Sequence, residues 1–386
     1  MDTNSRQQEL LRKYLSNEST TEELEELFDC LDAREDDSYR VVMDELWSRI
    51  SAEKRLSKQS TKQVLNRIIQ RDASFNLGYK KIGKWSPLAA TILMLIVGAG
   101  CIYLIANRKN PLPSVAEEIT ERSKEDIKPG GKRAILQAGK EEIALSTKDT
   151  SFVLAGNTVH INGGDVTVAH VRPVQYTLKT PRGGEYSLVL GDGTKIWLNA
   201  DSKLTYPSIF RGNTREVRLT GEGYFKVKED ANRPFIVHTE KQSVQVLGTE
   251  FNIKAYHEEA ICMTTLVKGK VQVNSFGKRI LLEPGQQAIS DNQGQFRKQD
   301  AGIHKVTAWK DGYFWFDKTG IHDIMWQLSR WYDVGVKYED GLQPHQFMAI
   351  VSRDNDIRKI LELLQGTGAV HFVIIGNEVT VMEGKQ

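Results

Sequence analysis

Histidines and acidic residues are the side chains of this chain that could support catalysis or metal binding. Eight histidines are scattered along it, at positions 160, 170, 238, 257, 304, 322, 345 and 371. None lies in an HExxH motif or in a Cys–His cluster with the spacing of metal ligands. The sequence also has no nucleophile elbow, phosphate-binding loop or dinucleotide fingerprint. We therefore expect no metal, no cofactor and no catalytic residues, which favours a protein that acts by binding.

Asp192 and Glu222 are the two carboxylates that could serve a glycoside hydrolase, which needs paired acids on neighbouring strands. Each lies in a Gly-acid-Gly triplet, residues 191–193 and 221–223. Glycines at this spacing are typical of hairpin turns, where they supply positive φ. We interpret both triplets as turns, so an enzyme is the weaker alternative.

A long uncharged segment interrupts the polar sequence at residues 85–107 (WSPLAATILMLIVGAGCIYLIAN). A helix of this length, at about 1.5 Å per residue, covers roughly 30 Å of hydrocarbon. A signal peptide would begin near residue 1, and a buried core helix would normally carry some polar face. We therefore expect one transmembrane helix over residues 86–107, with membrane lipid as its partner.

Basic residues flank this segment unequally. Within about 20 residues on each side, five precede it, including the cluster Lys80, Lys81 and Lys84, and four follow it. The difference favours a cytoplasmic N-terminus, because positive charge is enriched on the cytoplasmic side. We expect a single-pass protein of the inner (plasma) membrane, with a periplasmic C-terminus.

Residues 1–75 show the apolar spacing of short amphipathic helices, and Thr20 and Glu23 form a capping box. We expect an all-α head. Its charge is segregated, with twelve acidic and two basic residues between positions 18 and 45. These acids are either solvated helix faces or a surface for a basic partner.

Beyond a polar linker at residues 108–134, the pattern changes to period two. Short apolar strands separated by turn dipeptides fill residues 135–300, which predicts an all-β sandwich or roll. Residues 305–386 predict a small α+β domain with helices at 321–334 and 356–368 on one sheet. Its aromatic residues form either a core or an exposed binding patch. They are Trp309, Tyr313, Phe314, Trp315, Phe316, Trp326, Trp331 and Tyr332.

Six segments share the motifs of one known family. They are TPRGGEYSLVLGDGTKIWLNADSKLTYPSIF, REVRLTGEGYFKV, PFIVHT, VQVLGTEFNI, TTLVKGKVQV and LEPGQQA, in this order between about residues 176 and 290. The chain closely resembles the FecR family of transmembrane anti-sigma factors. The N-terminal LLRKYLSNESTTEELEELF is similar to the family's anti-sigma head. The C-terminal block resembles the secretin/TonB short N-terminal-like domain that ends one FecR subclass.

The resemblance implies a relay across the cell envelope. The head would bind an extracytoplasmic-function sigma factor, and the periplasmic part would contact the signalling domain of a TonB-dependent outer-membrane transporter. No direct contact with nucleic acid is expected. The predicted sigma-binding residues are Leu24, Leu27, Phe28, Leu31, Leu46 and Trp47. A structural or trafficking component of the cell envelope is the alternative, since secretin-like domains also occur in transport machines.

The motif VQVLGTEFNI resembles the place where members of the family cut themselves. The threonine hydroxyl of Thr249 could attack the carbonyl of Gly248, giving an ester that water opens. The other interpretation is a β-turn or bulge in which Gly248 adopts positive φ.

Overall fold

The computed structural model describes residues 127–139, 141–145 and 175–384, three strands between Phe152 and Thr167, and ten residues of the N-terminal part. These ten are positions 6, 9, 10, 13, 19, 20, 22, 23, 26 and 27. By its packing the chain divides into two compact units, Met1–Glu35 with Glu125–Gln386, and Asp36–Lys124. The second unit lies outside the described residues.

The fold class expected from the sequence is wrong for this structure. The sequence favours a multidomain chain with an all-α head, one transmembrane helix, an all-β periplasmic domain and a small α+β domain. The described residues are instead mostly strands, with only three short α-helices among them: α7 (Ile303–Thr307), α8 (Ile321–Tyr332) and α9 (Ile357–Gln365). No described helix is long and apolar enough to cross a membrane.

The physical reason lies in helix length and charge. The longest described helix, α8, has 12 residues and rises about 18 Å, well short of roughly 30 Å of hydrocarbon. It also carries Asp323 and Arg330. The expected membrane segment at 86–107, and the rest of the head beyond residue 27, lie outside the described residues.

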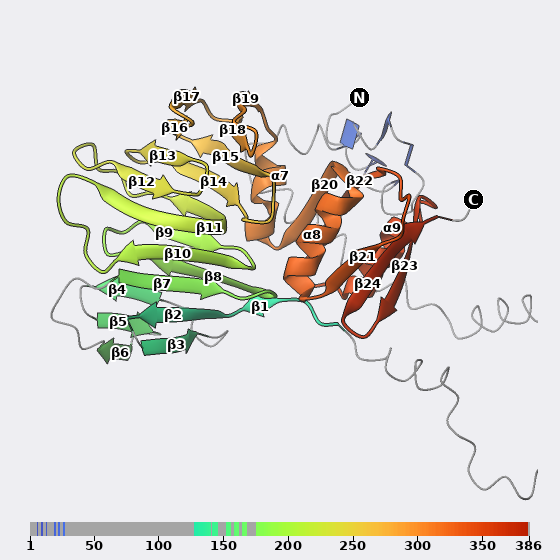
Figure 1. Ribbon diagram of the computed structural model, residues 1–386, viewed down its shortest axis with the longest axis horizontal. Coiled ribbons are helices and arrows are strands. Elements are labelled where there is room, and N and C mark those ends of the chain that lie inside the picture. The colour runs from blue at the N-terminus through green and yellow to red at the C-terminus, as the bar shows by residue number, and fades with distance from the viewer. Residues whose placement is uncertain are drawn as a thin grey trace, which may run out of the picture. The chain divides into compact units, whose positions relative to one another are not determined.

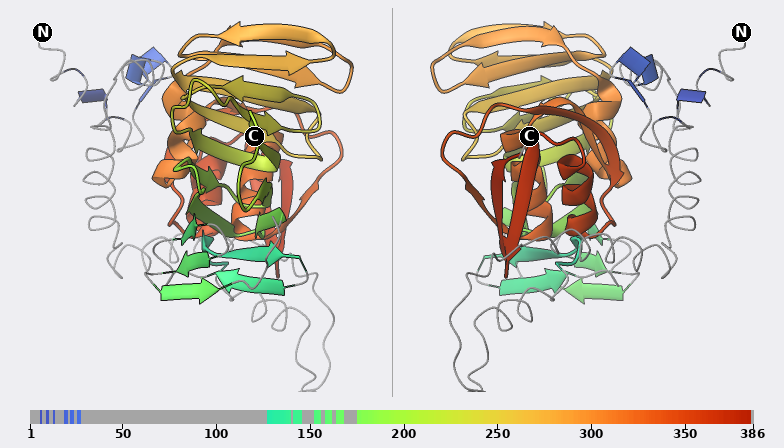
Figure 2. Two further views of the ribbon diagram at one scale, coloured as in Figure 1. Left: turned by 90° about the vertical axis from the view of Figure 1, so that its left-hand side faces the viewer. Right: turned by 90° about the vertical axis from the view of Figure 1, so that its right-hand side faces the viewer.

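Strands β1 to β19 are joined by hydrogen bonds into one continuous sheet system. Figures 1 and 2 show that they succeed one another in nearly sequence order, from the green β2 and β7 to the orange β16–β19. Their bounds are β1 Gly131–Lys132, β2 Ala134–Ala138, β3 Glu141–Leu145, β4 Phe152–Ala155, β5 Thr158–Ile161, β6 Gly164–Thr167, β7 Gln175–Thr180, β8 Gly184–Val189, β9 Lys195–Leu198, β10 Ser202–Pro207, β11 Arg215–Lys226, β12 Phe235–His238, β13 Ser243–Val246, β14 Glu250–Ala255, β15 Ile261–Lys268, β16 Val271–Ser275, β17 Lys278–Leu282, β18 Gln286–Asp291 and β19 Phe296–Asp300.

The pairings form two ladders that share strand β11. One ladder runs β3, β2, β7, β10, β11, β12, β13, β16, β17. The other runs β6, β5, β4, β8, β9, β11, β14, β15, β18, β19. The first half of β11 pairs with β10 and β12, and its second half, from Gly221 on, pairs with β9 and β14.

Gly221 marks the point where β11 passes from one ladder to the other. Its φ is 93°, and a Cβ at this position would lie 2.4 Å from Oγ of Ser202. Only glycine meets both conditions. The sequence interpretation of Gly221 and Gly223 as hairpin glycines is therefore wrong, because both lie inside β11, whereas Gly193 does occupy the β8–β9 turn.

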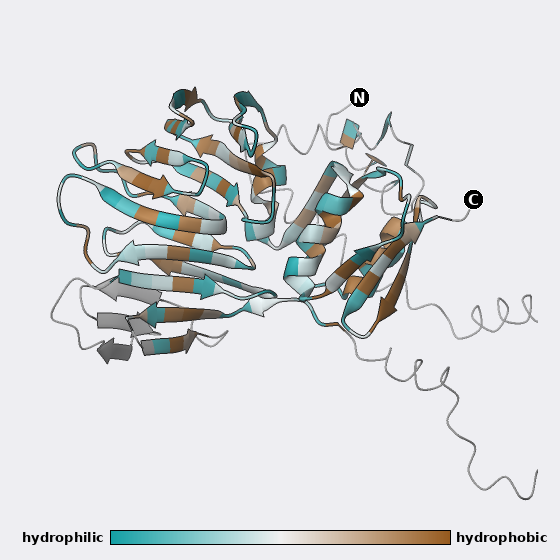
Figure 3. Ribbon diagram, viewed as in Figure 1, coloured by the Kyte–Doolittle hydropathy of each residue, from teal (hydrophilic) through white to brown (hydrophobic). Residues whose placement is uncertain are grey.

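Alternating side chains of the two ladders build the core. Figure 3 shows brown and teal residues alternating along many of the strands. Phe225 of β11 stacks on Phe251 of β14, with ring centroids 5.1 Å apart, and both are fully buried. Burying one such side chain stabilises the fold by about 1.5–3 kcal/mol.

The C-terminal residues form two small ladders and the three helices. A 3-10 helix, η2, follows α7 directly. Strand β20 pairs with β22, and β24 pairs with both β21 and β23, so the helices do not lie on one sheet as the sequence predicts. The predicted helices at 321–334 and 356–368 are confirmed as α8 and α9. The remaining bounds are η2 Ala308–Asp311, β20 Tyr313–Gly320, β21 Gly335–Tyr338, β22 Gln346–Ser352, β23 Val370–Ile375 and β24 Glu378–Glu383.

Candidate functional site

The Gly248–Thr249 bond lies in a bend between β13 and β14. Thr249 is buried, and its Oγ1 donates a hydrogen bond to the carbonyl oxygen of Lys270, 3.0 Å away. Gly248 does lie in a bend, as the alternative interpretation holds, but it is not among the residues with positive φ, so that part of the alternative is wrong. Glycine is needed for another reason: a Cβ at position 248 would lie 2.7 Å from Cα of Glu229.

The carbonyl groups on both sides of this bond are fixed by hydrogen bonds. The Leu247 oxygen accepts from the backbone N–H of Asp230 at 2.9 Å, and the Thr249 oxygen accepts from the N–H of Val227 at 3.0 Å. The Gly248 oxygen faces Gly269, where a Cβ would lie 3.2 Å from it and 3.0 Å from Thr249 Oγ1. Hydrogen bonds thus hold the segment that contains the reacting groups, and Gly248 and Gly269 leave no side chain beside them.

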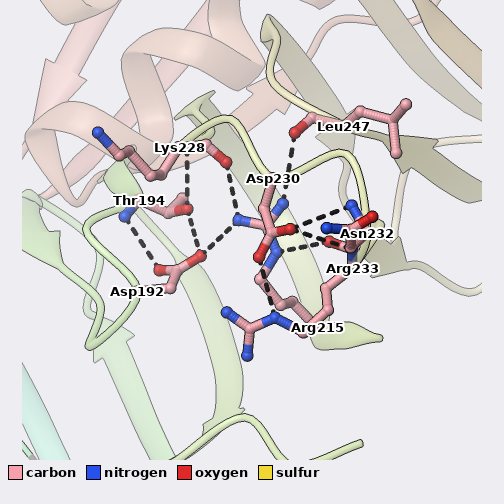
Figure 4. A network of polar contacts seen from close by, with 8 residues as sticks. All are labelled: Asp192, Thr194, Arg215, Lys228, Asp230, Asn232, Arg233 and Leu247. Atoms are coloured by element: carbon pink, nitrogen blue, oxygen red, sulfur yellow. Dashed lines mark hydrogen bonds and ion pairs between the residues drawn. The ribbon is translucent and has the colours of Figure 1, made fainter. Parts of the chain in front are cut away.

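Arg215 is the hub of the network that holds this segment (Figure 4). Its guanidinium donates to the carbonyl oxygens of Arg233 and Lys228 at 2.8 Å and of Leu247 at 3.4 Å. It also pairs with Asp192 at 2.8 Å, and the side chains of Arg215 and Asp192 are 1% and 7% exposed. One buried cation therefore ties together the β8–β9 turn, the loop between β11 and β12 and the bend before β14.

Asp192 and Glu222 belong to separate networks. Asp192 accepts from Thr194 and pairs with Arg215. Glu222 accepts from Nδ2 of Asn199 at 2.8 Å and of Asn252 at 3.1 Å. The structure does not bring the two carboxylates together in one network. Among the residues described, no group of three or more His, Cys, Asp or Glu could hold a metal ion.

The C-terminal elements contact strand β14 directly. Nε1 of Trp309 donates to Oδ1 of Asn252 at 3.2 Å. Arg330 of α8 lies 3.8 Å above the Tyr256 ring and pairs with Glu259 at 2.8 Å. The side chains of Arg330 and Glu259 are 6% and 3% exposed, so this is a buried ion pair. A second bond joins Arg330 to the exposed Glu258.

A second set of contacts joins the C-terminal elements to β8, to the turn before it and to Asn199. Arg353, 2% exposed, donates to Glu185 at 3.1 Å and Asn199 at 2.9 Å, and it stacks 3.6 Å from the Trp331 ring. Burial raises the pKa of Glu185 although the Arg353 guanidinium lies beside it. Arg182, in the turn before β8, donates hydrogen bonds to backbone oxygens of the C-terminal elements, at the end of α8 and just beyond it.

A cleft of about 690 Å³ opens beside these contacts, lined by β14, β15 and β18 on one side and by α7, β20 and α8 on the other. Seven of the eight clustered aromatic residues are buried, which confirms the core interpretation for them. Trp326 is partly exposed and lines the cleft.

The N-terminal part is described at only a few residues. The capping box is confirmed: Thr20 N–H donates to Glu23 at 3.1 Å, and Glu23 N–H donates to Thr20 Oγ1 at 3.3 Å. Hydrogen bonds from Lys13 and from the Thr20 N–H lower the pKa of Glu23. Glu26 pairs with Arg6, whereas Glu22 is exposed.

Of the predicted sigma-binding residues, the structure describes Leu27, which is 2% exposed within this chain. Leu24, Phe28, Leu31, Leu46 and Trp47 lie outside the described residues.

Comparison with known sequences gives two matches along the chain. The family model of the FecR protein matches residues 176–272, and the model named FecR, C-terminal, matches residues 313–381. Both regions of the chain thus match the FecR family. The two matched regions are the ones that Arg330 and Arg353 join. No functionally curated protein matches the chain.

Solved structures agree with this assignment. Two crystal structures, at 1.65 and 2.50 Å resolution, of a Parabacteroides distasonis protein provisionally described as an anti-sigma factor resemble the chain. Each is 27% identical to it, with a TM-score of 0.52. They cover 54% and 55% of this chain, and 99% and 100% of their own. Family and neighbours together support a role as an anti-sigma factor, with a sigma factor as partner.

The buried arginines were not predicted from the sequence, although the sequence holds a signal for Arg215. Along REVRL, period two puts Arg215 on the same face as Val217 and Leu219, and all three are at most 2% exposed. An arginine at an inward position of a strand needs several acceptors. No comparable signal marks Arg330 or Arg353, whose acceptors come from distant segments.

Proposed function

We propose that this chain is an inner-membrane anti-sigma factor that passes a signal from the periplasm to the cytoplasm. Its head binds an extracytoplasmic-function sigma factor, and its C-terminal part receives the signalling domain of a TonB-dependent outer-membrane transporter. Residues 86–107 hold it in the lipid, with the N-terminus in the cytoplasm and the C-terminus in the periplasm. The observation that carries the proposal is the buried contact between the two FecR regions.

On the cytoplasmic side, the charges of the head support an electrostatic component of sigma binding. Sigma factors carry basic surfaces that bind DNA, and an acidic partner can mask them. Glu23 and Glu26 already pair with Lys13 and Arg6, whereas Glu22 is exposed. Glu22 is therefore the described acid best able to meet a basic surface. A charge at the buried Leu27 would instead disrupt the head itself.

On the periplasmic side, the contacts give a path for force. The C-terminal elements hold β14 through Asn252 and, just beyond it, through Tyr256 and Glu259. Strand β14 pairs with β11 over six residue pairs, Gly221 to Lys226. A transporter domain that pulls on the C-terminal elements would load this pairing first, because the buried Arg330 contact transmits the pull.

We also propose that the chain cuts itself between Gly248 and Thr249. The Thr249 oxygen forms a bond to the Gly248 carbonyl carbon, the C–N bond breaks, and the hydroxyl proton passes to the Thr249 nitrogen. Water then hydrolyses the ester, which leaves a Gly248 carboxylate and restores the hydroxyl. The two fragments stay together through the pairing of β11 with β14 until the signal separates them.

A promoter reporter tests the signalling proposal. A chain that ends at His304 should keep the promoter silent, because the head is intact, and it should no longer respond to the inducing ligand. Truncation also leaves Glu259 without Arg330, so full-length Arg330→Ala is needed as a second variant and should respond weakly. Lys337→Ala, at an exposed ion pair, is the control. A truncated chain that responds normally would contradict the proposal.

A further inference from the structure

The loop that contains Gly248–Thr249 is fixed by a residue distant from it in sequence. Arg215 opens β11, and its Nη2 reaches the Leu247 oxygen, one residue before the scissile pair. Its other nitrogens hold the carbonyl oxygens of Arg233 and Lys228, in the loop between β11 and β12 that hydrogen-bonds to the same bend. Phe235 covers the guanidinium at 5.5 Å from the ring centroid.

The geometry points to Arg215 as the positioning residue for self-cleavage at Gly248–Thr249, an inference that rests on the proposed cleavage. For attack, Thr249 Oγ1 must leave the Lys270 oxygen and turn toward the Gly248 carbonyl carbon. That rotation is productive only if the carbonyl stays in place. The Leu247 carbonyl accepts from the Asp230 N–H at 2.9 Å and from the side chain of Arg215 at 3.4 Å, while Val227 fixes the carbonyl of Thr249 on the other side.

A guanidinium is the group that suits this task. Arg215 makes four hydrogen bonds with three different nitrogens, to Asp192 and to three backbone oxygens. A lysine ammonium has a single nitrogen and cannot span these acceptors. Arg215→Lys therefore keeps the charge beside Asp192 and loses the bond to Leu247. The variant separates positioning from charge neutralisation.

The test is the rate at which the C-terminal fragment appears in the full-length chain carrying a C-terminal tag. The fragment from Thr249 to Gln386 makes up about a third of the 43.7 kDa chain. Thr249→Ser should cleave and Thr249→Ala should not. Arg215→Lys should slow cleavage about tenfold or more per folded molecule, because displacement by 1 Å can cost up to about a hundredfold. Arg215→Gln serves as a second variant if Arg215→Lys folds poorly.

Val217→Ala is the matched control, since Val217 is buried on the same face of β11 but has no bond to the three loops. It should lower the unfolding midpoint and leave the cleavage rate within about twofold, as expected for a distant packing change. Hydroxylamine, which cleaves esters, should not restore the fragment in Arg215→Lys, because the acyl shift itself is slowed. Rescue by hydroxylamine would overturn the inference.

The possible failures are distinguishable. A wild-type chain that stays intact would refute self-cleavage itself and the inference with it. Equal rates for wild type and Arg215→Lys, measured on folded protein, would leave self-cleavage standing and overturn the role of Arg215. Equal slowing by Val217→Ala and Arg215→Lys would also overturn it, because general loss of stability would then explain both.

Discussion

At the scale of single residues, buried arginines decide how the described part of this chain holds together. The side chains of Arg215, Arg330 and Arg353 are at most 6% exposed, and each bonds to partners from distant segments. A buried cation is costly to desolvate, so each depends on its carboxylate and carbonyl acceptors. Their value lies in specificity: each fixes which segments must meet.

The Arg330–Glu259 pair gives the first prediction. Arg330→Ala leaves the carboxylate of Glu259 buried with Lys254 as its remaining cation, and removal of one partner from a buried pair costs about 3–5 kcal/mol. Lys337→Ala breaks the exposed pair with Glu378 and should cost about 1 kcal/mol or less. Urea unfolding of the full-length chain in detergent, followed by tryptophan fluorescence, measures both. Equal losses would contradict the burial argument.

At the scale of elements, the sequence predicts which way residues face better than which strands meet. Period two finds most strands of residues 175–300, and the apolar stripe of α8 and the capping box of Thr20 follow from local spacing. Local spacing does not predict three other features: the transfer of β11 between ladders, the split C-terminal sheet and the contact of α8 with Glu259. They depend on partners far apart in sequence, and no local pattern records them. For the same reason, Gly248 and Thr249 were found by motif, whereas Arg215 was not.

Gly221 gives the prediction at this scale. Gly221→Ala should destabilise the fold by more than Gly212→Ala, although both glycines have positive φ, 93° and 83°. Backbone strain at such positions costs about 1–3 kcal/mol. Gly221→Ala adds a clash with Ser202, whereas nothing lies within 4 Å of a Cβ at Gly212. Thermal unfolding midpoints compare the two variants, and a larger loss for Gly212→Ala would show that the crossing of β11 is not sterically restricted.

At the scale of the whole molecule, we propose that the chain acts as a relay between compartments. The FecR regions form one buried contact, and the head is proposed to lie on the other side of a membrane. Alkaline phosphatase, which is active only in the periplasm, should be active when fused after Gln386 and inactive when fused near Phe75. The reverse pattern would remove the basis for a signal that crosses the membrane.

Binding of a sigma factor by this chain is tested most directly by capture of that partner. The full-length tagged chain is purified from membranes, and the proteins that remain bound are identified by mass spectrometry. An extracytoplasmic-function sigma factor should co-purify, and Glu22→Lys should weaken its binding more at low salt than at high salt, because salt screens exposed charges. Recovery of the chain, cut or uncut, without any sigma factor, at low salt and in the absence of inducer, would contradict the proposed function.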